Sequence, residues 1–251
     1  MKNPIYSHVS LVSLILCLTL LTIHACKPSS HEVTVEEGPE YEGVLTEVLS
    51  QEEQAAMNPD DVIAILKKGN IRFTNNNLTA RDHSAQVRNS VEGQYPKAIV
   101  LSCIDSRIPV EDVFDRGIGD LFVARVAGNV VNTDILGSME YGCKVAGSKL
   151  ILVLGHEHCG AVNAAIKDVQ MGNITEMLSK IRPSVIQAKD SFPEGDVKNA
   201  KYVHQVCVFN VQSAMAQIQE QSEILKSMIA SGEIKIVGAV YDMDSGKVDF
   251  L

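Results

Sequence analysis

The sequence predicts an α/β domain with a mostly parallel central sheet flanked by helices. Three short apolar runs lack helical spacing, and they lie at Ala98–Leu101, Leu121–Val126 and Lys149–Leu154. Continuous apolar runs of this length are typical of parallel strands that are buried on both faces. Between the last two runs, apolar residues recur every three or four positions over 136–146, as in a helix. The order strand, helix, strand is that of parallel α/β proteins.

The other elements follow from capping signals and periodicity. Asn58 is a predicted cap for a helix that begins at Pro59, because proline suits the first helical position and apolar residues follow at helical spacing. Thr133 is the predicted cap of the helix between the second and third strands. A long helical region is predicted from about Val197 to Ala230, and residues 233–251 are predicted to form two strands around a turn at 244–246.

Composition and charge exclude several classes of protein. The 251 residues are 45% hydrophobic and 21% charged, which is enough apolar material for a core without disulfides. The formal net charge is -9 and no stretch concentrates basic residues, so neither a nucleic-acid partner nor binding to an anionic membrane surface is expected. Six cysteines are too few and too irregularly spaced for a disulfide scaffold, so each is judged by its neighbours.

The first residues have the pattern of an export signal. Residues 3–26 contain no formally charged side chain, and an apolar core over 9–23 follows Lys2. This core is short for a membrane span, which needs about 20 predominantly apolar residues. Its end at Ile23-His24-Ala25-Cys26 resembles a bacterial lipobox, so we expect residues 1–25 to be a signal peptide and Cys26 to be the lipidated N-terminus. An uncleaved N-terminal anchor and ordinary secretory cleavage are the alternatives, and each of them also exports the domain.

Residues 26–54 are predicted to form an acidic tether or N-terminal arm ahead of a domain at 55–251. Between Lys27 and Gln54 there are eight glutamates and little apolar periodicity. With a lipid at Cys26, the domain would belong to the bacterial cell envelope, periplasm-facing or at the surface, with the anchor as its only membrane contact. In the alternative, Val44, Leu45 and Val48 start a helix that packs on the domain or on a partner subunit.

Chemistry-bearing side chains follow two of the predicted strands. After the first strand, Cys103, Asp105 and Arg107 alternate, and in an extended segment they lie on one side. After the third strand, His156 and Cys159 are three residues apart, so one helical turn or a tight loop aims both at a common point. Because the carboxyl ends of adjacent parallel strands form the edge where open α/β sheets bind ligands, we expect these side chains to converge.

Two thiols and an imidazole suit a catalytic zinc ion. Structural zinc sites use four protein ligands, whereas a catalytic site keeps one position for water. Cys103, His156 and Cys159 would be the three ligands, with Asp105 as a conditional fourth. Two thiolates cancel the charge of the ion, so it acidifies water less strongly than a site of three histidines does. A carboxylate kept ionised by Arg107 would accept a hydrogen bond from a zinc-bound hydroxide, which turns the proton towards Asp105 and leaves a lone pair for attack.

Each of these residues also has an ordinary structural interpretation. Taken singly, the two cysteines would be small buried hydrophobic residues, His156 a hydrogen-bonded core histidine, and Asp105 with Arg107 a structural ion pair. Their convergence at two strand ends favours the metal site. Cys143 and Cys207 lie in helical patterns without polar neighbours, so we expect both in the core.

With these motifs the sequence resembles the β-class carbonic anhydrases. The family's Cys-x-Asp-x-Arg motif matches Cys103–Arg107, its His-x-x-Cys motif matches His156–Cys159, and the resemblance extends from about Asp61 to Leu251. It implies Zn²⁺ on Cys103, His156 and Cys159, a dyad of Asp105 and Arg107, and a compact α/β subunit that forms homodimers or larger homo-oligomers.

The resemblance also implies a substrate pocket. Gln94, nine residues before the first ligand, matches a glutamine that hydrogen-bonds the substrate, although by itself it would be a surface loop residue. Phe122 and Tyr141 match positions that wall an apolar pocket, often with contributions from the neighbouring subunit. Gly160 matches a position whose backbone NH can face the substrate.

The activity that the resemblance implies is that of a lyase: the reversible hydration of carbon dioxide to bicarbonate and a proton by a zinc-bound hydroxide. The family also contains enzymes that hydrolyse carbon disulfide or carbonyl sulfide on the same zinc site, and the motifs do not separate these substrates. A non-catalytic zinc-binding protein, in which Asp105 permanently closes the metal, is another alternative. A thiol-redox protein is disfavoured because Cys103 and Cys159 lack the Cys-x-x-Cys spacing.

Overall fold

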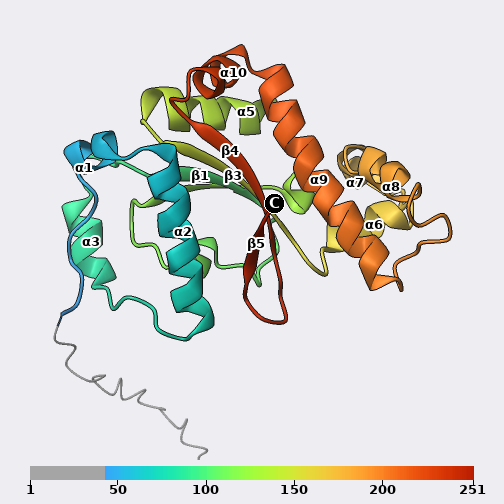
Figure 1. Ribbon diagram of the computed structural model, residues 1–251, viewed down its shortest axis with the longest axis horizontal. Helices are drawn as coiled ribbons and strands as arrows, with labels where there is room; N and C mark the ends of the chain where they lie inside the picture. Colours follow the sequence, from blue (N-terminus) through green and yellow to red (C-terminus); the bar gives the residue numbers. More distant parts are fainter. Residues whose placement is uncertain (1–42) are drawn as a thin grey trace, which may run out of the picture. The chain divides into compact units, whose positions relative to one another are not determined.

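A five-stranded sheet lies at the centre of the part of the chain that the computed structural model describes, residues 43–251 (Figure 1). Its order is β2-β1-β3-β4-β5, with bounds Leu121–Arg125, Ala98–Ser102, Leu150–His156, Lys235–Tyr241 and Val248–Phe250. β1 pairs in parallel with both β2 and β3, and β3 pairs in parallel with β4. β5 is antiparallel to β4. The predicted strands and the mostly parallel sheet are thus confirmed.

Helices cover both faces of the sheet, as predicted. The helical segments are α1 (Gln51–Ala56), α2 (Pro59–Thr74), α3 (His83–Asn89), α4 (Val110–Val113), η1 (Ala127–Asn129), α5 (Thr133–Glu140), η2 (Tyr141–Val145), α6 (Gly160–Ile166), α7 (Gly172–Ser179), α8 (Arg182–Ala188), α9 (Ala200–Gln221) and α10 (Glu223–Ala230). In β1, Ile99 and Leu101 pack against α5, α9 and α10, whereas Ala98 and Val100 pack against α2 and α4. Because successive strand residues point to opposite faces, the unbroken apolar run of β1 requires cover on both.

The helix ends agree with the sequence in part. Asn58 caps α2 as predicted, because its side chain accepts hydrogen bonds from two backbone NH groups of the first turn. The prediction of Thr133 as a cap is wrong: Asn132 has the extended backbone of a cap residue and accepts from the backbone NH of Ile135, and Thr133 is the first helical residue. The helix then changes to a π-helical turn at Tyr141–Val145.

The long helical region predicted near the C-terminus is confirmed, with one break. Ser222 ends α9 and caps α10, since its hydroxyl oxygen accepts from the backbone NH of Leu225. α9 crosses the sheet beside β3 and β4, and α10 turns back against α5 (Figure 1). Cys143 and Cys207 are buried in the core between these elements, as predicted.

The end of the predicted acidic arm packs on the domain. Leu45 pairs with Arg81 in a short parallel bridge. In α1, Gln54 is buried and its side-chain amide donates to the carbonyl oxygens of Pro96 and Ala146, at 2.8 Å each. The predicted signal peptide and Cys26 lie outside the described residues. Within residues 43–251, no helix combines the length and the apolar character that a membrane span requires.

Asp115 is a buried carboxylate that ties the loop before α3 to the domain. Its oxygens accept hydrogen bonds from the side chains of Arg72 and Arg81 and from both the backbone NH and the hydroxyl of Thr79. Burial alone would raise the pKa of Asp115, but these bonds lower it to about 2. The carboxylate is therefore ionised at neutral pH and neutralises cations that are themselves partly buried.

Replacing Asp115 with alanine is expected to lower the free energy of unfolding by about 3 kcal/mol, because buried Arg81 would keep its charge and lose its partner. Since the pKa of Asp115 is lower in the folded state than the roughly 3.9 of an unfolded chain, this contribution is present above pH ~4 and is lost as the pH falls towards 2. Urea unfolding at neutral and acidic pH measures both effects. The control is Asp249→Ala, which removes an exposed ion pair with Lys247, and equally small losses in the two variants would contradict the prediction.

Candidate metal centre

The register of the sheet brings the two predicted ligand segments together. Ser102, the last residue of β1, pairs with Leu154 of β3, and β3 continues for two more residues to His156. Cys103 therefore leaves β1 beside the end of β3. Both segments lie at the carboxyl edge of the parallel strands, where α/β sheets place their ligands.

A tight turn after β3 adds the third ligand. His158 has a positive φ of 54°, and Cys159 follows it as the residue that precedes α6. The ligand atoms of Cys103, His156 and Cys159 all lie within 4.8 Å of one another, and all three residues are buried. The predicted convergence of the three ligands is therefore present in the structure.

One ring nitrogen of His156 belongs to this cluster and makes no hydrogen bond within the described residues. Nδ1 lies 2.8 Å from the carbonyl oxygen of Glu157. A carbonyl oxygen only accepts, so Nδ1 carries the proton and Nε2 carries the lone pair. Nε2 is buried and has no hydrogen-bond partner among the described residues. A buried nitrogen without a partner, next to two thiols, fits a zinc ion, which binds histidine nitrogen and cysteine sulfur.

The two thiols of the cluster differ in acidity. The pKa of Cys103 is lowered, chiefly because the Cys159 thiol donates a hydrogen bond to it, with further support from the backbone NH of Gly128, 3.3 Å from Sγ. The pKa of Cys159 is raised, because a thiolate at Cys103 lies beside it and because it is buried. A bound cation supplies the positive charge that both thiolates need.

Asp105 and Arg107 form a two-pronged ion pair next to the ligands. Arg107 donates from Nε to Oδ1 at 2.9 Å and from Nη2 to Oδ2 at 2.7 Å. These bonds lower the pKa of Asp105 to about 2, so its carboxylate is ionised at neutral pH. The structure does not bring Asp105 into the ligand cluster, and both of its oxygens are hydrogen-bonded to Arg107 instead.

The route by which these two residues meet differs from the prediction. β1 ends at Ser102, and the backbone NH of Arg107 donates to Asp105 Oδ1 at 3.0 Å, so the pair closes a turn. The predicted extended segment was wrong because an i, i+2 spacing fits both an extended strand and an aspartate turn. Arg125 holds this turn, since its guanidinium donates to the backbone carbonyl oxygens of Cys103 and Asp105.

Gly160 lies at the first position of α6, directly after Cys159. The first backbone NH groups of a helix have no acceptor within the helix. A methyl group on Gly160 would have no atom within 4 Å, so there is open space beside this residue. An NH group at the edge of a metal cluster, with free space beside it, is suited to a small polar ligand.

Gln94, predicted to bind substrate, lies far from the metal ligands of its own chain. Gln94 is exposed in the loop before β1, whereas Cys103 follows the end of that strand. The five residues of β1 separate the two positions by roughly 16 Å, at a strand rise of about 3.3 Å per residue. Within one chain, Gln94 is therefore out of reach of the cluster.

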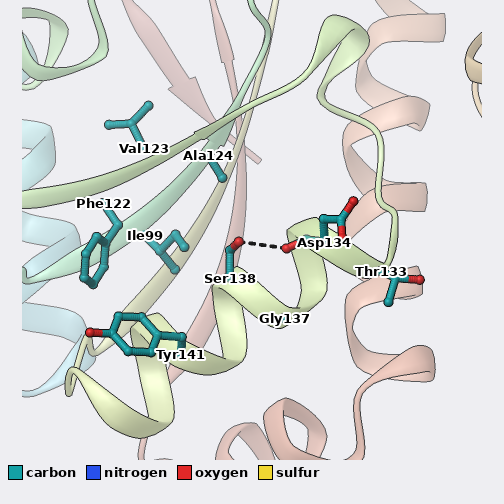
Figure 2. A pocket seen from close by; sticks show the side chains of 9 residues that line it. All are labelled: Ile99, Phe122, Val123, Ala124, Thr133, Asp134, Gly137, Ser138 and Tyr141. Atoms are coloured by element: carbon teal, nitrogen blue, oxygen red, sulfur yellow. Dashed lines mark hydrogen bonds between the residues drawn. The ribbon is translucent and has the colours of Figure 1, made fainter.

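Phe122 and Tyr141 lie near Gln94 and not near the cluster. The two rings pack edge to face with centroids 6.1 Å apart, and they line an open cavity of about 600 Å³ beside the edge strand β2 (Figure 2). Tyr141 is 52% exposed and also lines a cavity of about 380 Å³ together with Gln94. None of the three metal ligands lines either cavity. Three of the four predicted pocket residues, Gln94, Phe122 and Tyr141, thus line neighbouring cavities that contain none of the metal ligands.

The sequence analysis did not single out Gly128, which contacts a ligand, or Asn210, which is hydrogen-bonded to Gly128. Gly128 donates its backbone NH to Cys103 Sγ, and its carbonyl oxygen accepts from Asn210 Nδ2 at 2.8 Å. The spacing of reactive side chains contains no signal for them, because any residue except proline can supply a backbone NH. The positive φ of 72° at Gly128 marks the position only once the fold is known.

Known proteins resemble this chain in both sequence and fold. A family model described as carbonic anhydrase matches residues 98–248. Carbonic anhydrase 2 of Mycobacterium tuberculosis is 34% identical over 197 residues, which cover 76% of this chain and 91% of that protein. The carbonic anhydrase of Mycolicibacterium smegmatis is 34% identical over 199 residues, with 76% and 93% covered.

Solved structures share the same architecture. A tetrameric β-carbonic anhydrase of the filamentous ascomycete Sordaria macrospora has a TM-score of 0.60 at 23% identity, with 66% of this chain and 85% of that chain covered. The β-carbonic anhydrase of Coccomyxa, solved with acetazolamide, has a TM-score of 0.59 at 26% identity, with 67% and 77% covered.

Proposed function

Because this chain belongs to the β-class carbonic anhydrases, we propose that it is a zinc enzyme that hydrates carbon dioxide reversibly to bicarbonate and a proton. The observation that carries the proposal is the buried cluster of Cys103, His156 and Cys159, in which His156 Nε2 has no other partner among the described residues. When bound, zinc lowers the pKa of water and so supplies a nucleophile near neutral pH.

The contribution of Asp105 is to orient the attacking oxygen. Its carboxylate is ionised because Arg107 donates to both oxygens. Oδ1 also accepts from the backbone NH of Arg107, so Oδ2 is the oxygen with a lone pair available. An ionised carboxylate can only accept a hydrogen bond. Asp105 therefore turns the proton of the attacking oxygen towards itself and leaves a lone pair of that oxygen free for the carbon of the substrate.

The substrate is held by a few donors and an apolar wall. The backbone NH of Gly160 and the side-chain amide of Gln94 donate to the oxygens of carbon dioxide and of bicarbonate. Carbon dioxide has no net dipole, so the rings of Phe122 and Tyr141 suit it as a wall. After bicarbonate leaves, a new water would have to lose a proton to solvent before the next turnover.

A second copy of the chain completes this pocket. Gln94, Phe122 and Tyr141 lie on a surface next to the edge strand β2, away from the ligands of their own subunit. A homodimer, alone or within a larger homo-oligomer, would place this surface against the metal centre of the partner. The tetrameric state of the Sordaria macrospora enzyme is in line with such assembly.

The decisive experiment is a stopped-flow assay of carbon dioxide hydration, with metal analysis on the same sample. We expect one zinc per subunit and a hydration rate that scales with zinc content. Zinc without hydration would instead indicate a non-catalytic metal protein. Carbon disulfide and carbonyl sulfide are assayed in parallel, and turnover of either without turnover of carbon dioxide would identify a sulfur-specific hydrolase.

Complementation between two inactive variants tests the shared pocket. In a hybrid of Cys159→Ala and Gln94→Ala chains, one site combines intact ligands from one subunit with an intact glutamine from the other. If Gln94 acts across the interface, purified hybrids are expected to recover close to half of the wild-type rate, although each parent is impaired. Hybrids that are no faster than the mean of their parents would show that Gln94 does not act in the site of its partner.

The N-terminal segment supports a proposal about location, an envelope lipoprotein anchored at Cys26. Diacylation plus an N-terminal acyl chain exceeds the two signals that stable anchoring needs. Cys26→Ser is expected to abolish lipid attachment and to leave hydration activity unchanged, because the residue precedes the domain. Mass spectrometry of the native N-terminus measures this directly. An unmodified terminus elsewhere would leave only simple secretion or an uncleaved anchor.

A further inference from the structure

Helix α9 is hydrogen-bonded to one metal ligand directly and to a second through Gly128. Cys207 Sγ donates to the carbonyl oxygen of His156 at 3.4 Å. One helical turn later, Asn210 Nδ2 donates to the carbonyl oxygen of Gly128 at 2.8 Å, and the NH of Gly128 lies 3.3 Å from Cys103 Sγ. One helix thus holds both the β1 side and the β3 side of the cluster.

Asn210 is an unusual residue for its position. It is 3% exposed, and the neighbours that share the buried face of α9 are mostly apolar, including Val206, Val211 and Ala214. A buried amide costs free energy unless it is hydrogen-bonded, so an apolar side chain would pack here at lower cost. What the amide adds is its bond to Gly128.

The turn that contains Gly128 has a fixed conformation. Gly128 has a φ of 72°, a conformation in which a side chain is strained, and a Cβ atom there would also displace Ile181 Cδ1, 2.6 Å away. On one side, the NH of Val126 donates to the carbonyl oxygen of Ser102, the residue before Cys103. On the other side, Asn210 holds the Gly128 carbonyl. Asn210 holds the peptide that follows the Gly128 Cα, and the bond of Val126 holds the chain just before it. Between these two anchors, the NH of Gly128, which belongs to the preceding peptide, stays directed at the sulfur.

We infer that Asn210 is a positioning residue for the metal centre, which acts through Gly128 to keep a hydrogen bond on Cys103 Sγ. The inference rests on the proposed zinc enzyme and deepens it. Partners of metal ligands tune the ligand and fix its direction, and their loss typically lowers metal affinity by about tenfold to a hundredfold. Among the described residues Asn210 has no hydrogen bond to a metal ligand, so its effect passes through the backbone of Gly128.

The first test uses the wild-type protein. The full chain is loaded with ¹¹³Cd in place of zinc, and NMR measures the scalar coupling between the metal and backbone amide protons. We expect a coupling between ¹¹³Cd and the Gly128 amide proton, transmitted through Cys103 Sγ. If one cadmium binds per chain and this coupling is absent, the inference about Asn210 fails and the proposed zinc function stands. If no cadmium binds, the proposed zinc function fails as well.

The second test removes the amide. Asn210→Leu keeps a similar shape without the donor, and we expect zinc affinity, measured by competition with a chelator, to fall about tenfold to a hundredfold. With Co²⁺ in the site, the thiolate-to-metal charge-transfer band should shift, because the sulfur loses its hydrogen bond. Ile218→Ala, a buried change further along α9, is the control for lost packing and should leave both readouts unchanged.

Two outcomes separate positioning from packing. Wild-type zinc affinity and an unshifted cobalt band in Asn210→Leu, with a loss of stability like that of Ile218→Ala, would overturn the inference. If the leucine variant does not fold, Asn210→Ser replaces it, because its side chain is too short to reach the Gly128 carbonyl, and the ¹¹³Cd coupling decides in any case.

Discussion

The Cys159→Ala protein is expected to contain no tightly bound zinc. Its hydration rate should fall more than about a thousandfold, towards the rate of the uncatalysed reaction. Cys159 supplies one of three ligand atoms that lie within 4.8 Å of one another, and Cys103 and His156 alone leave zinc with half of its usual four ligands. No neighbouring carboxylate replaces the sulfur, because both oxygens of Asp105 are held by Arg107.

Metal content and stopped-flow rate are measured on the same preparation of this variant. Cys143→Ala is the matched control, since that thiol is equally buried but belongs to the core, where burial raises its pKa to about 12. The control should lose stability and keep its zinc. Equimolar zinc and high activity in Cys159→Ala would refute the assignment of this residue as a ligand.

Asp105→Asn is expected to keep its zinc and to lose about a hundredfold to ten-thousandfold in hydration rate, the range over which a positioned acid–base group contributes. The amide of asparagine has a donor where the carboxylate has an acceptor, so it no longer fixes the proton of the attacking oxygen. Arg107 also loses its charged partner. Because the pKa of Asp105 is about 2, the wild-type rate should show no loss from protonation of this carboxylate at any pH above about 4.

The asparagine variant is compared with Asp244→Asn, which changes an exposed carboxylate near His158, outside the dyad. The control should keep its full rate. Arg107→Ala should share the defect of Asp105→Asn, since the two side chains act as a pair. A near-wild-type rate in Asp105→Asn, with normal zinc, would reduce Asp105 to a structural anchor of the loop.

The convergence of Cys103, His156 and Cys159 could be predicted from the sequence because the sheet is parallel. A strand buried on both faces, such as β1, has an unmistakable apolar run, and parallel neighbours must end at the same edge. Cys103 and His156 are separated by 53 positions in the sequence, yet they follow or end adjacent strands. The types of side chain and the order of the strands predicted the same site, and in the structure the three possible ligand atoms lie within 4.8 Å of one another.

Other parts of the site depend on geometry that spacing does not encode. The alternation of Asp105 and Arg107 was compatible with a strand, but the side chain of Asp105 accepts from the backbone NH of Arg107 and closes a turn instead. Gln94 precedes Cys103 by only nine residues, and a straight strand places it at the opposite end of β1. The contact of Gly128 with Cys103 comes from a backbone NH, which has no signature in the sequence.

The parallel register of β1 and β3 also governs when the centre can form during folding. Parallel strands cannot be joined by a hairpin, and the crossover between these two contains β2, α5 and η2. An unfolded chain must therefore close a long loop before the segment with Cys103 meets the segment with His156 and Cys159. The loss of chain entropy makes contacts of such long range form slowly. We therefore expect zinc to bind to an assembled sheet and not to nucleate folding. Its binding free energy adds to the stability of the finished domain, so the melting temperature rises with the concentration of free zinc.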